Sequence, residues 1–465
     1  MNLLGEYDVI VVGAGMSGVV SAVTAARRGA RTLLVESSGL IGGLITGGRL
    51  TKPTGIVQPG VYRELIDRAA RHGGADSGVQ RSYWGAYTGV FDPEVMQRAI
   101  IEALDDGGAE LLLFASVTDI VTRDGQVAGV VVATKRGSET VTAKTVIDAT
   151  GDGDVAVLAG ATYGIGREGD GITQPMTSYF RILNVDFPTL AAYCQKNPGD
   201  ISELVLPEDD QAGNEPYALK FFMTGLAQRI EQARRDGFDW IVPRNTITMK
   251  AGLLPGEINV NVTRVHGDAL DPWVRTAAVL QIRRQAYCAF DFLKKYVDGF
   301  ADAVLLDIAP VLGVRETRRI DGDYQLTEQD VTDEARFDDA IGLCNAPIDI
   351  HEPGGNKALM QSVGAGYGIP YRTMLPAGIE GLLTVGRCIS ADHVAFGSTR
   401  NTPACALTAQ AGGIAAAMAA SEGVPPRKVS ARDIQDTLRE IGVVLGTTAA
   451  DVLPDAQIPD PAVSP

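Results

Sequence analysis

The sequence has 465 residues, enough for two or three structural units with sizeable cores. Its 41 lysine and arginine residues face 57 aspartate and glutamate residues, and the formal net charge of −16 argues against general nucleic-acid binding. A hydrophobic content of 45% excludes wholesale disorder and fibrous repeats. Glycine is the outlier, because 54 glycines exceed the roughly 33 expected at about 7% usage.

The cysteines and the apolar segments indicate a cytoplasmic protein. The five cysteines are widely spaced without a C-x-x-C pair, which disfavours a disulfide framework, a zinc knuckle and a dithiol redox centre. No basic segment precedes the first apolar run, so we predict no signal peptide and a cytoplasmic location. The longest apolar stretch, 405–420, is short for a membrane span, so we predict a buried helix and no membrane partner.

The amino-terminal residues predict half of a doubly wound parallel sheet. Residues 7–12 are a β-branched apolar run, 17–28 carry a small-residue helical face, and 31–35 form a second strand. A helix over 91–107 follows, with Asp92-Pro93 as its cap and first turn. The strands expected after it include a three-strand meander. Their ranges are 110–114, 117–123, 127–134, 140–142 and 145–149.

A glycine motif directly after the first strand predicts dinucleotide binding. The motif runs Gly13, Gly15, Met16, Ser17 and Gly18, and it opens the predicted helix. In this pattern the glycines permit a tight turn, a close approach of a pyrophosphate and close packing of helix on strand. Glu36 ends the second strand, where a carboxylate accepts from a ribose 2′-hydroxyl, so the ligand is FAD or NAD rather than NADP.

Three further glycine-rich turns favour a ligand longer than one nucleotide. The loop 42–48 contains Gly42, Gly43 and Thr46, and it follows Glu36 closely. Two later predicted strands also end in glycine turns, as does the first. These turns are Gly151-Asp152 and Gly386-Arg387.

The motifs GAGMSG with Glu36, ESSGLIGG, ATGDGD, GLLTVGRCIS and GSTRNTPACALTAQAGG resemble the FAD-dependent oxidoreductases with a glutathione-reductase-type FAD domain. Within these, the chain is most similar to a bacterial group related to fumarate reductase and succinate dehydrogenase flavoproteins, over roughly residues 6–423. The resemblance implies an α/β fold, with a Rossmann-like FAD-binding domain of parallel sheet and β-meander and an inserted α+β substrate domain. The cofactor implied is FAD.

The resemblance also assigns roles along the cofactor. Gly13, Gly15 and Gly18, with Met16 and Ser17 in the same turn, would hold the pyrophosphate, and Glu36 the adenosine ribose. Gly42, Gly43 and Thr46 would pass under the cofactor, Val117 would hold the adenine by its backbone, and Gly151 with Asp152 would hold the far side of the diphosphate region. Gly386 and Arg387 would lie by the ribityl chain, and a helix starting near Asn401 and Thr402 would point at the flavin pyrimidine.

Five segments are predicted from these motifs and from composition. Residues 1–162 and 367–423 are the two parts of the FAD-binding domain. Residues 163–366 are the inserted domain, with long helices at 217–235 and 272–298. A C-terminal helical segment covers 424–450, and 451–465 are predicted to be disordered.

Two departures narrow the class of enzyme. Disulfide reductases and aromatic hydroxylases usually carry Gly-Asp at the third turn, whereas this chain has Gly386-Arg387. The one other stretch with G-x-G-x-x-G spacing, Gly164 to Gly169, has no obvious following helix, so no second dinucleotide site is predicted. Both features disfavour a dithiol reductase and a two-nucleotide reductase.

Candidate catalytic residues come from two segments. Arg315, in a run with Arg318 and Arg319, could clamp a substrate carboxylate or relay a proton, and its alternative is a structural ion pair. Arg400 directly precedes the helix expected to face the flavin. His393 lies nearby and could act as acid or base, with a structural histidine as its rival and covalent flavin attachment at His393 or Cys388 as a further alternative. The histidines show no zinc spacing, so no metal site is predicted.

The sequence therefore predicts an FAD-dependent oxidoreductase that transfers hydride between flavin N5 and a small organic substrate held between the two domains. One alternative is an FAD-binding electron-transfer subunit of a larger complex. Another is an RNA-modifying flavoprotein, which the charge of −16 opposes, so we expect no nucleic-acid partner. Homo-oligomerisation is left open.

Overall fold

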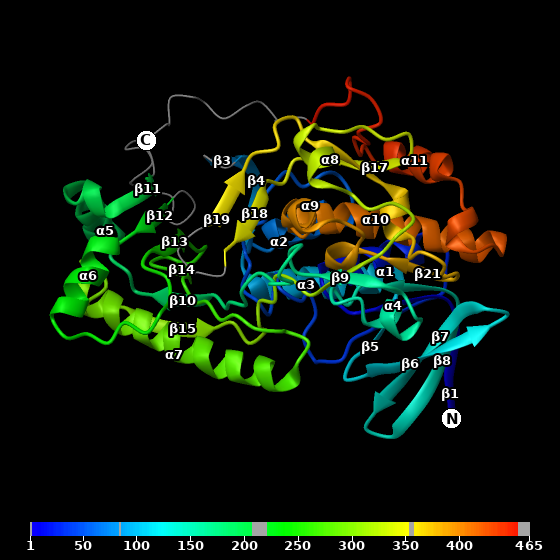
Figure 1. The fold of residues 1–465 in the computed structure, drawn as a ribbon, viewed down its shortest axis with the longest axis horizontal. Helices are drawn as coiled ribbons and strands as arrows, with labels where there is room; N and C mark the ends of the chain where they lie inside the picture. The colour runs from blue at the N-terminus through cyan, green and yellow to red at the C-terminus, as the bar shows by residue number, and fades with distance from the viewer. Residues whose placement is uncertain (1, 83–84, 207–220, 353–357, 454–465) are drawn as a thin grey trace.

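The computed structural model describes residues 2–82, 85–206, 221–352 and 358–453. It has two lobes (Figure 1). One lobe combines the amino-terminal third of the chain with its carboxyl-terminal part, so that blue and orange segments lie together. The other is built from the middle of the chain, drawn in green. The predicted α/β fold with an inserted unit is confirmed.

A parallel sheet forms the centre of the first lobe. Its strand order is β5-β2-β1-β8, and β21 branches off this path by pairing in parallel with β8. Residues 9–12 of β1 are at most 5% exposed, as expected for a strand covered on both faces. The strands are β1 (Asn2–Val12), β2 (Thr32–Val35), β5 (Glu110–Leu112), β8 (Gly137–Asp148) and β21 (Leu382–Thr384).

The predicted meander joins this sheet through one long strand. β6 (Ser116–Arg123), β7 (Gln126–Thr134) and the first half of β8 pair antiparallel, while the second half of β8 pairs in parallel with β1 and β21. The prediction of two separate strands at 140–142 and 145–149 is wrong. Exposed Lys144 interrupts the apolar pattern and pairs with Asp8, but the backbone ladder to β1 continues past it.

Helices α1 (Met16–Arg27) and α10 (Thr402–Glu422) pack closely above the sheet (Figure 1). The Ser21 hydroxyl donates to the Ala409 carbonyl at 2.9 Å. α10 is long and apolar enough to span a membrane by composition alone, but 89% of that apolar window is buried inside the protein. The close contact depends on small residues, and Gly413 faces the backbone of α1.

Replacing Gly413 with valine should destabilise the protein. A Cβ atom at this position would lie 2.6 Å from the Ser21 carbonyl oxygen, and backbone does not yield as a side chain does. The gain in helix propensity from glycine to valine, about 0.4 kcal/mol, should be outweighed, for a net loss of about 2 kcal/mol in unfolding free energy. Urea unfolding measures this loss. The control is Ser421→Val at an exposed position of the same helix, and its unfolding free energy should change little. Equal stability of the two variants would contradict this packing.

The remaining elements of the first lobe complete its core. Asp92 caps α3 by accepting from the Glu94 and Val95 amides, as predicted. Leu326 and Ile341 share the hydrophobic core of α1 and α10, so the chain has rejoined the first lobe by Leu326. The elements are α2 (Val61–Arg71), β3 (Ala75–Ser82), β4 (Gly85–Phe91), α3 (Pro93–Gly107), α4 (Asp154–Leu158), β9 (Tyr163–Ile165), β16 (Arg318–Ile320), α8 (Glu328–Thr332), β17 (Ala340–Cys344), β18 (Ile348–His351), β19 (Ala358–Gln361), β20 (Tyr367–Pro370), α9 (His393–Thr399) and α11 (Ala431–Glu440).

The second lobe is an antiparallel sheet covered on one face by helices. Its strand order is β11-β12-β13-β14-β10-β15. Residues alternate along β13, where Ile247, Met249 and Ala251 enter the lobe's core while Thr248 and Lys250 face the other way. The uncovered face is thereby turned toward the first lobe. The strands are β10 (Phe180–Leu183), β11 (Ile201–Val205), β12 (Phe222–Gly225), β13 (Ile247–Ala251), β14 (Ile258–Asn261) and β15 (Val304–Ile308).

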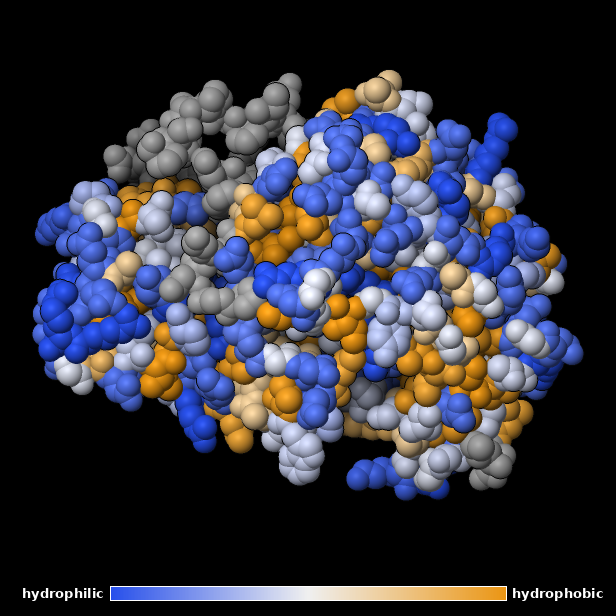
Figure 2. Space-filling view, in the orientation of Figure 1, coloured by the Kyte–Doolittle hydropathy of each residue, from blue (hydrophilic) through white to orange (hydrophobic). Residues whose placement is uncertain are grey.

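Three helices cover this sheet: α5 (Phe187–Lys196), α6 (Ala227–Arg235) and α7 (Pro272–Tyr296). The helix predicted at 272–298 is confirmed as α7. The helix predicted at 217–235 is wrong at its start, because Phe222–Gly225 is a strand paired with β11 and β13. Its first residues lie outside the described part of the chain. The surface over α6 is strongly hydrophilic (Figure 2), since only Ile230 and Ala233 of this helix are buried.

The carboxyl-terminal residues are ordered up to the end of the described chain. Asp451 accepts from the Thr447 and Thr448 amides, and Leu453 is 2% exposed. The predicted disorder is therefore wrong for 451–453. Residues 454–465 lie outside the described residues.

Candidate active site

A cavity of about 530 Å³ lies at the carboxyl ends of β1, β2 and β8. Open α/β sheets bind ligands at this edge because the strand-to-helix turns gather there. Twelve of the sixteen predicted cofactor residues line it. They are Gly13, Gly15, Met16, Ser17, Glu36, Gly42, Gly43, Val117, Gly151, Asp152, Arg387 and Thr402.

The first glycine turn shapes a cradle for a large anionic group. Gly13 has φ +96°, a left-handed conformation that favours glycine, and it carries β1 into the turn. A Cβ atom on Gly18 would lie 1.7 Å from the Gly13 carbonyl oxygen, so Gly18 allows α1 to pack against the turn. An added Cβ on Gly15 would meet no heavy atom within 4 Å and would stand in the cavity. Backbone amides at the start of α1 can therefore approach a pyrophosphate.

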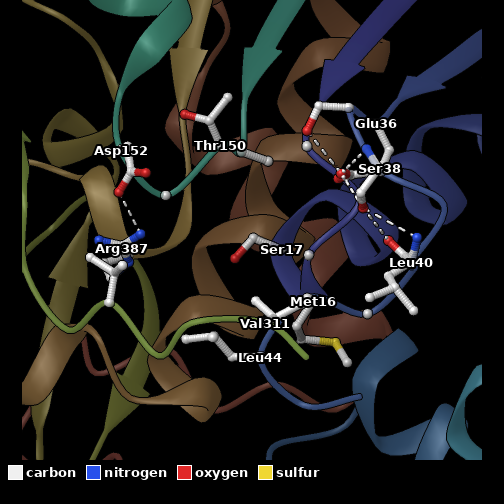
Figure 3. Close-up of a pocket in the computed structure, with 18 of the residues that line it drawn as sticks. Met16, Ser17, Glu36, Ser38, Leu40, Leu44, Thr150, Asp152, Val311 and Arg387 are labelled. Carbon is white, nitrogen blue, oxygen red and sulfur yellow. Dashed lines mark hydrogen bonds and ion pairs between the residues drawn. The ribbon is translucent and has the colours of Figure 1, made fainter. Parts of the chain in front are cut away.

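Glu36 lies at the end of β2, on the opposite side of the cavity from Asp152 and Arg387 (Figure 3). One carboxylate oxygen accepts from the Ala14 amide at 2.9 Å, and the other accepts from the Ser38 amide at 2.8 Å. The Ser37 and Ser38 hydroxyls also donate to the second oxygen, so the carboxylate is fixed and the first oxygen keeps a lone pair for a ribose hydroxyl. Val117, at the start of β6, also lines this cavity.

The other four predicted cofactor residues do not line this cavity, but each lies near it. Gly18 packs against the turn. The Thr46 hydroxyl is buried and donates to the Ile41 carbonyl, which closes the 42–48 loop. Gly386 has φ +75° and lies against Ser17. Asn401 lines a second cavity.

Asp152 and Arg387 form an ion pair at 2.6 Å across two separate turns (Figure 3). Burial alone would raise the pKa of Asp152, but Arg387 and a hydrogen bond from Thr317 lower it below its ordinary value. The carboxylate therefore stays charged and holds the guanidinium in place. This pair explains how an arginine fits at the third glycine turn, where related families carry an aspartate.

The amino terminus of α10 opens on the cavity at Thr402. The Asn401 side chain makes no capping bond to the helix. First-turn amides and the positive end of the dipole of this 21-residue helix are therefore directed at a ligand. A long cavity with a glycine cradle, a ribose-binding carboxylate and a second helix terminus fits an extended dinucleotide such as FAD.

A second cavity of about 370 Å³ lies between the first lobe and the uncovered face of the inserted sheet. Its roof includes cavity-facing residues of β12, β13 and β14, such as Thr224, Thr248 and Asn261. The two cavities meet, since the same side chains line both. The shared residues are Leu44, Leu50, Val314, Arg387, Arg400 and Thr402.

Four arginines gather at one end of the second cavity. Arg244, Arg315 and Arg400 line it, and Arg264 lies just behind with 2% exposure. Arg400 donates to Asp349 at 2.9 Å. Within the described residues, Arg244, Arg264 and Arg315 form no ion pair with a carboxylate, and donate instead to uncharged oxygens and a histidine nitrogen. Their acceptors are Asn261, Thr248, Thr263, Pro175 and His351.

The pKa values of two of these arginines are lowered, as expected where buried positive charges lie close together. Burial and the neighbouring Arg400 lower the pKa of Arg315 to about 10. Burial, with Arg315 and Arg244 nearby, holds the pKa of Arg264 well below its ordinary value. Uncompensated buried charges are costly, and a bound anion could offset them.

His351 and Asp349 connect these arginines. The Arg264 guanidinium donates to His351 Nδ1 at 3.1 Å, and His351 Nε2 lies 3.2 Å from the Asp349 carboxylate. Burial lowers the pKa of His351 to about 3, so the ring is neutral near pH 7. With Nδ1 accepting from Arg264, the ring proton is on Nε2 and faces Asp349.

The structure brings Arg315 and Arg400 together but places His393 elsewhere. His393 Nδ1 lies 2.9 Å from Glu316, a fully buried carboxylate that also pairs with Arg319. His393 lines neither of the two cavities. Arg318 donates to Asp154 and to the Asp152 carbonyl, beside the cofactor cavity.

Sequence reasoning missed several residues of the second cavity: Arg244, Arg264, Asp349, His351 and Lys52. Neither a motif nor a glycine turn marks them, and they are spread over 300 residues of chain. The i, i+2 alternation of polar residues in 248–250, between apolar neighbours, marks the strand that faces this cavity but none of these five residues.

Comparisons with known proteins agree with the site. The profile of the FAD-dependent oxidoreductase family matches residues 8–438. Protein FixC of Escherichia coli K12 is 32% identical over 174 residues, covering 33% of this chain and 38% of FixC. Thiamine thiazole synthase of Thermococcus kodakarensis is 30% identical over 156 residues, covering 32% of this chain and 59% of that enzyme. The similarity thus spans less than two thirds of either relative.

Among solved structures, a geranylgeranyl bacteriochlorophyll reductase-like protein from Thermoplasma acidophilum matches 96% of this chain and 94% of its own. The identity is 14% and the TM-score is 0.47. The family profile, by contrast, covers most of the chain, including every cofactor turn described above. The chain belongs to the FAD-dependent oxidoreductases, and its cofactor is FAD.

Proposed function

We propose that this enzyme transfers hydride between flavin N5 and a small substrate that carries a carboxylate. The observation that supports this proposal is the buried arginine cluster at the junction of the two cavities. Arg315 and Arg244 hold guanidinium groups in the second cavity without an ion-pair partner among the described residues. A substrate carboxylate would supply the missing negative charge through charge-assisted hydrogen bonds.

The protein would supply position and polarity to the reaction. When bound, FAD supplies the hydride acceptor or donor. Arg400 lines both cavities, so its guanidinium can contact a substrate that lies against the flavin. Its guanidinium also donates to the Asp349 carboxylate at 2.9 Å, which holds it in this position. Arg315 and Arg244 would orient the carboxylate, and the inserted sheet would exclude water from above.

Replacing Arg315 with methionine tests the proposal. The holoenzyme is titrated with acetate and oxalate while the flavin spectrum is followed. We expect FAD to stay bound and the Kd of each anion to rise about 10- to 100-fold, since a charge-assisted hydrogen bond contributes about 1.5–3 kcal/mol. Arg244→Met should act in the same direction.

A matched control is Arg372→Met. Unlike Arg315, Arg372 pairs with a carboxylate, Asp339; its side chain is 46% exposed and it lines neither cavity. The Kd values should not change in this variant. Unchanged Kd values in both Arg315→Met and Arg244→Met would refute the carboxylate proposal.

A further inference from the structure

Lys52 is a buried amine in the wall of the second cavity. It is 6% exposed and lines the cavity together with Pro53 and Thr54. Two residues earlier, Leu50 lines both cavities, so this loop passes the junction where flavin and substrate meet. The Phe91 amide donates to the Thr51 carbonyl and ties the loop to the end of β4.

The charged groups around Lys52 come from several elements. Lys250 of β13 faces it from the inserted sheet, and Asp76 of β3 acts from the first lobe. Glu203 of β11 lines the same cavity. Burial, with the positive charge of Lys250, lowers the pKa of Lys52 to about 7, against the smaller opposing effect of Asp76. Near neutral pH the amine can therefore both accept and release a proton.

We propose that Lys52 is the proton-transfer residue of the reaction, and that the substrate is a carboxylate whose reacting carbon bears a hydroxyl or amino group. This inference rests on the proposed function. In the direction of oxidation, the C–H bond breaks and its electron pair leaves as hydride to the flavin. The proton of the O–H or N–H group passes to Lys52 Nζ. The products are a C=O or C=N group, an ammonium on Lys52 and the two-electron-reduced flavin.

Neither His351 nor His393 fits this role. Both ring nitrogens of His351 are occupied by Arg264 and Asp349. His393 is held by Glu316 away from both cavities. Arg315 and Arg400 would fix the carboxylate, and Lys52 lines the wall of the same cavity, where it would take the proton.

The ionisation of Lys52 can be measured without a substrate. The FAD-loaded protein is labelled competitively with acetic anhydride across pH 5–11, and peptides are quantified by mass spectrometry. Lys52 should label with a midpoint near pH 7, and Lys250→Met should move this midpoint upward. Surface Lys144, which pairs with Asp8, serves as the internal reference. A Lys52 midpoint equal to that of Lys144 would overturn the proposal.

The chemical role is measured by anaerobic flavin bleaching. The probes are glycolate, lactate, malate, glycine, alanine and aspartate. With the probe that bleaches fastest, the wild-type rate should rise about tenfold per pH unit below 7 and then level off. Lys52→Met should be slower by about 10²- to 10⁴-fold and lose this pH dependence, with FAD and oxalate binding retained. Lys52→Arg keeps the positive charge and should be equally slow.

The outcomes separate the two proposals. A Lys52→Met variant that bleaches at the wild-type rate with the same pH profile would overturn the role of Lys52 and leave the carboxylate site intact. Bleaching by none of the probes would overturn the substrate class proposed here, while the oxalate titrations of the arginine variants would still decide the anion site.

Discussion

Replacing Gly15 with valine should give a protein that folds but purifies without FAD. The position tolerates a side chain in the absence of ligand, because an added Cβ meets no heavy atom within 4 Å and φ is −66°. The same Cβ stands in the cavity where the pyrophosphate must approach the amides of α1. We expect FAD affinity to fall at least about 100-fold, or about 2.7 kcal/mol. Flavin absorbance after purification and FAD titration of the apoprotein measure this loss.

Gly18→Val is the matched comparison in the same motif. Here the Cβ would lie 1.7 Å from the Gly13 carbonyl oxygen, so the variant should lose stability as well as FAD. The thermal unfolding midpoint of apo Gly15→Val should equal that of the wild-type apoprotein, while that of Gly18→Val should be lower. A Gly15→Val protein that retains FAD at wild-type affinity would contradict the placement of the cofactor.

The FAD-binding half could be predicted because its information is local. In each cofactor turn, a strand, a glycine and the following residue are contiguous in sequence. A short motif therefore predicts both the local structure and the ligand contact. Gly13, Gly15, Glu36 and Gly151 accordingly line the predicted cavity. The helix predicted at 403–420 is found as α10 for the same reason, since it is a local run dominated by alanine and glycine.

The substrate cavity could not be predicted because no local pattern encodes it. Arg244 and Arg264 lie in short loops flanking strands, Arg315 follows the second lobe, and Asp349 is in a small hairpin. The pairing of β13 and β14 brings the first two together, and only the packing of the two lobes adds Arg315 and Asp349. For His393, a local pattern gave a wrong prediction. Its closeness in sequence to Arg400 favoured a role at the flavin, but at the start of α9 its ring faces Glu316.

Replacing Asp349 with asparagine should be strongly destabilising and should make stability depend on added anions. Asp349 is the carboxylate closest to four arginines, and it pairs with Arg400 and His351. Removing one partner of a buried ion pair leaves the others uncompensated, at a cost of about 3–5 kcal/mol. Urea unfolding of the apoprotein measures the loss. Oxalate should restore part of it in the variant and stabilise the wild type less, because an anion would replace the missing charge.

The pH dependence gives this prediction a second readout. Burial alone would raise the pKa of Asp349, but His351 and Arg400 hold it well below its ordinary value of 3.8. A carboxyl group with a lowered folded pKa contributes stability that is present above its unfolded pKa and is lost as the pH falls through the folded pKa. The difference in unfolding free energy between wild type and Asp349→Asn should therefore be constant from pH 5 to 8 and shrink only below about pH 4.

Asp339→Asn makes the same chemical change at a surface pair. Its partner Arg372 is 46% exposed, so the loss should stay within about 1 kcal/mol and should not respond to oxalate. Similar losses at Asp339 and Asp349, with no effect of oxalate at either, would mean that the arginine cluster carries no excess charge. The case for an anionic substrate would then fail, because that excess is what a substrate carboxylate would neutralise.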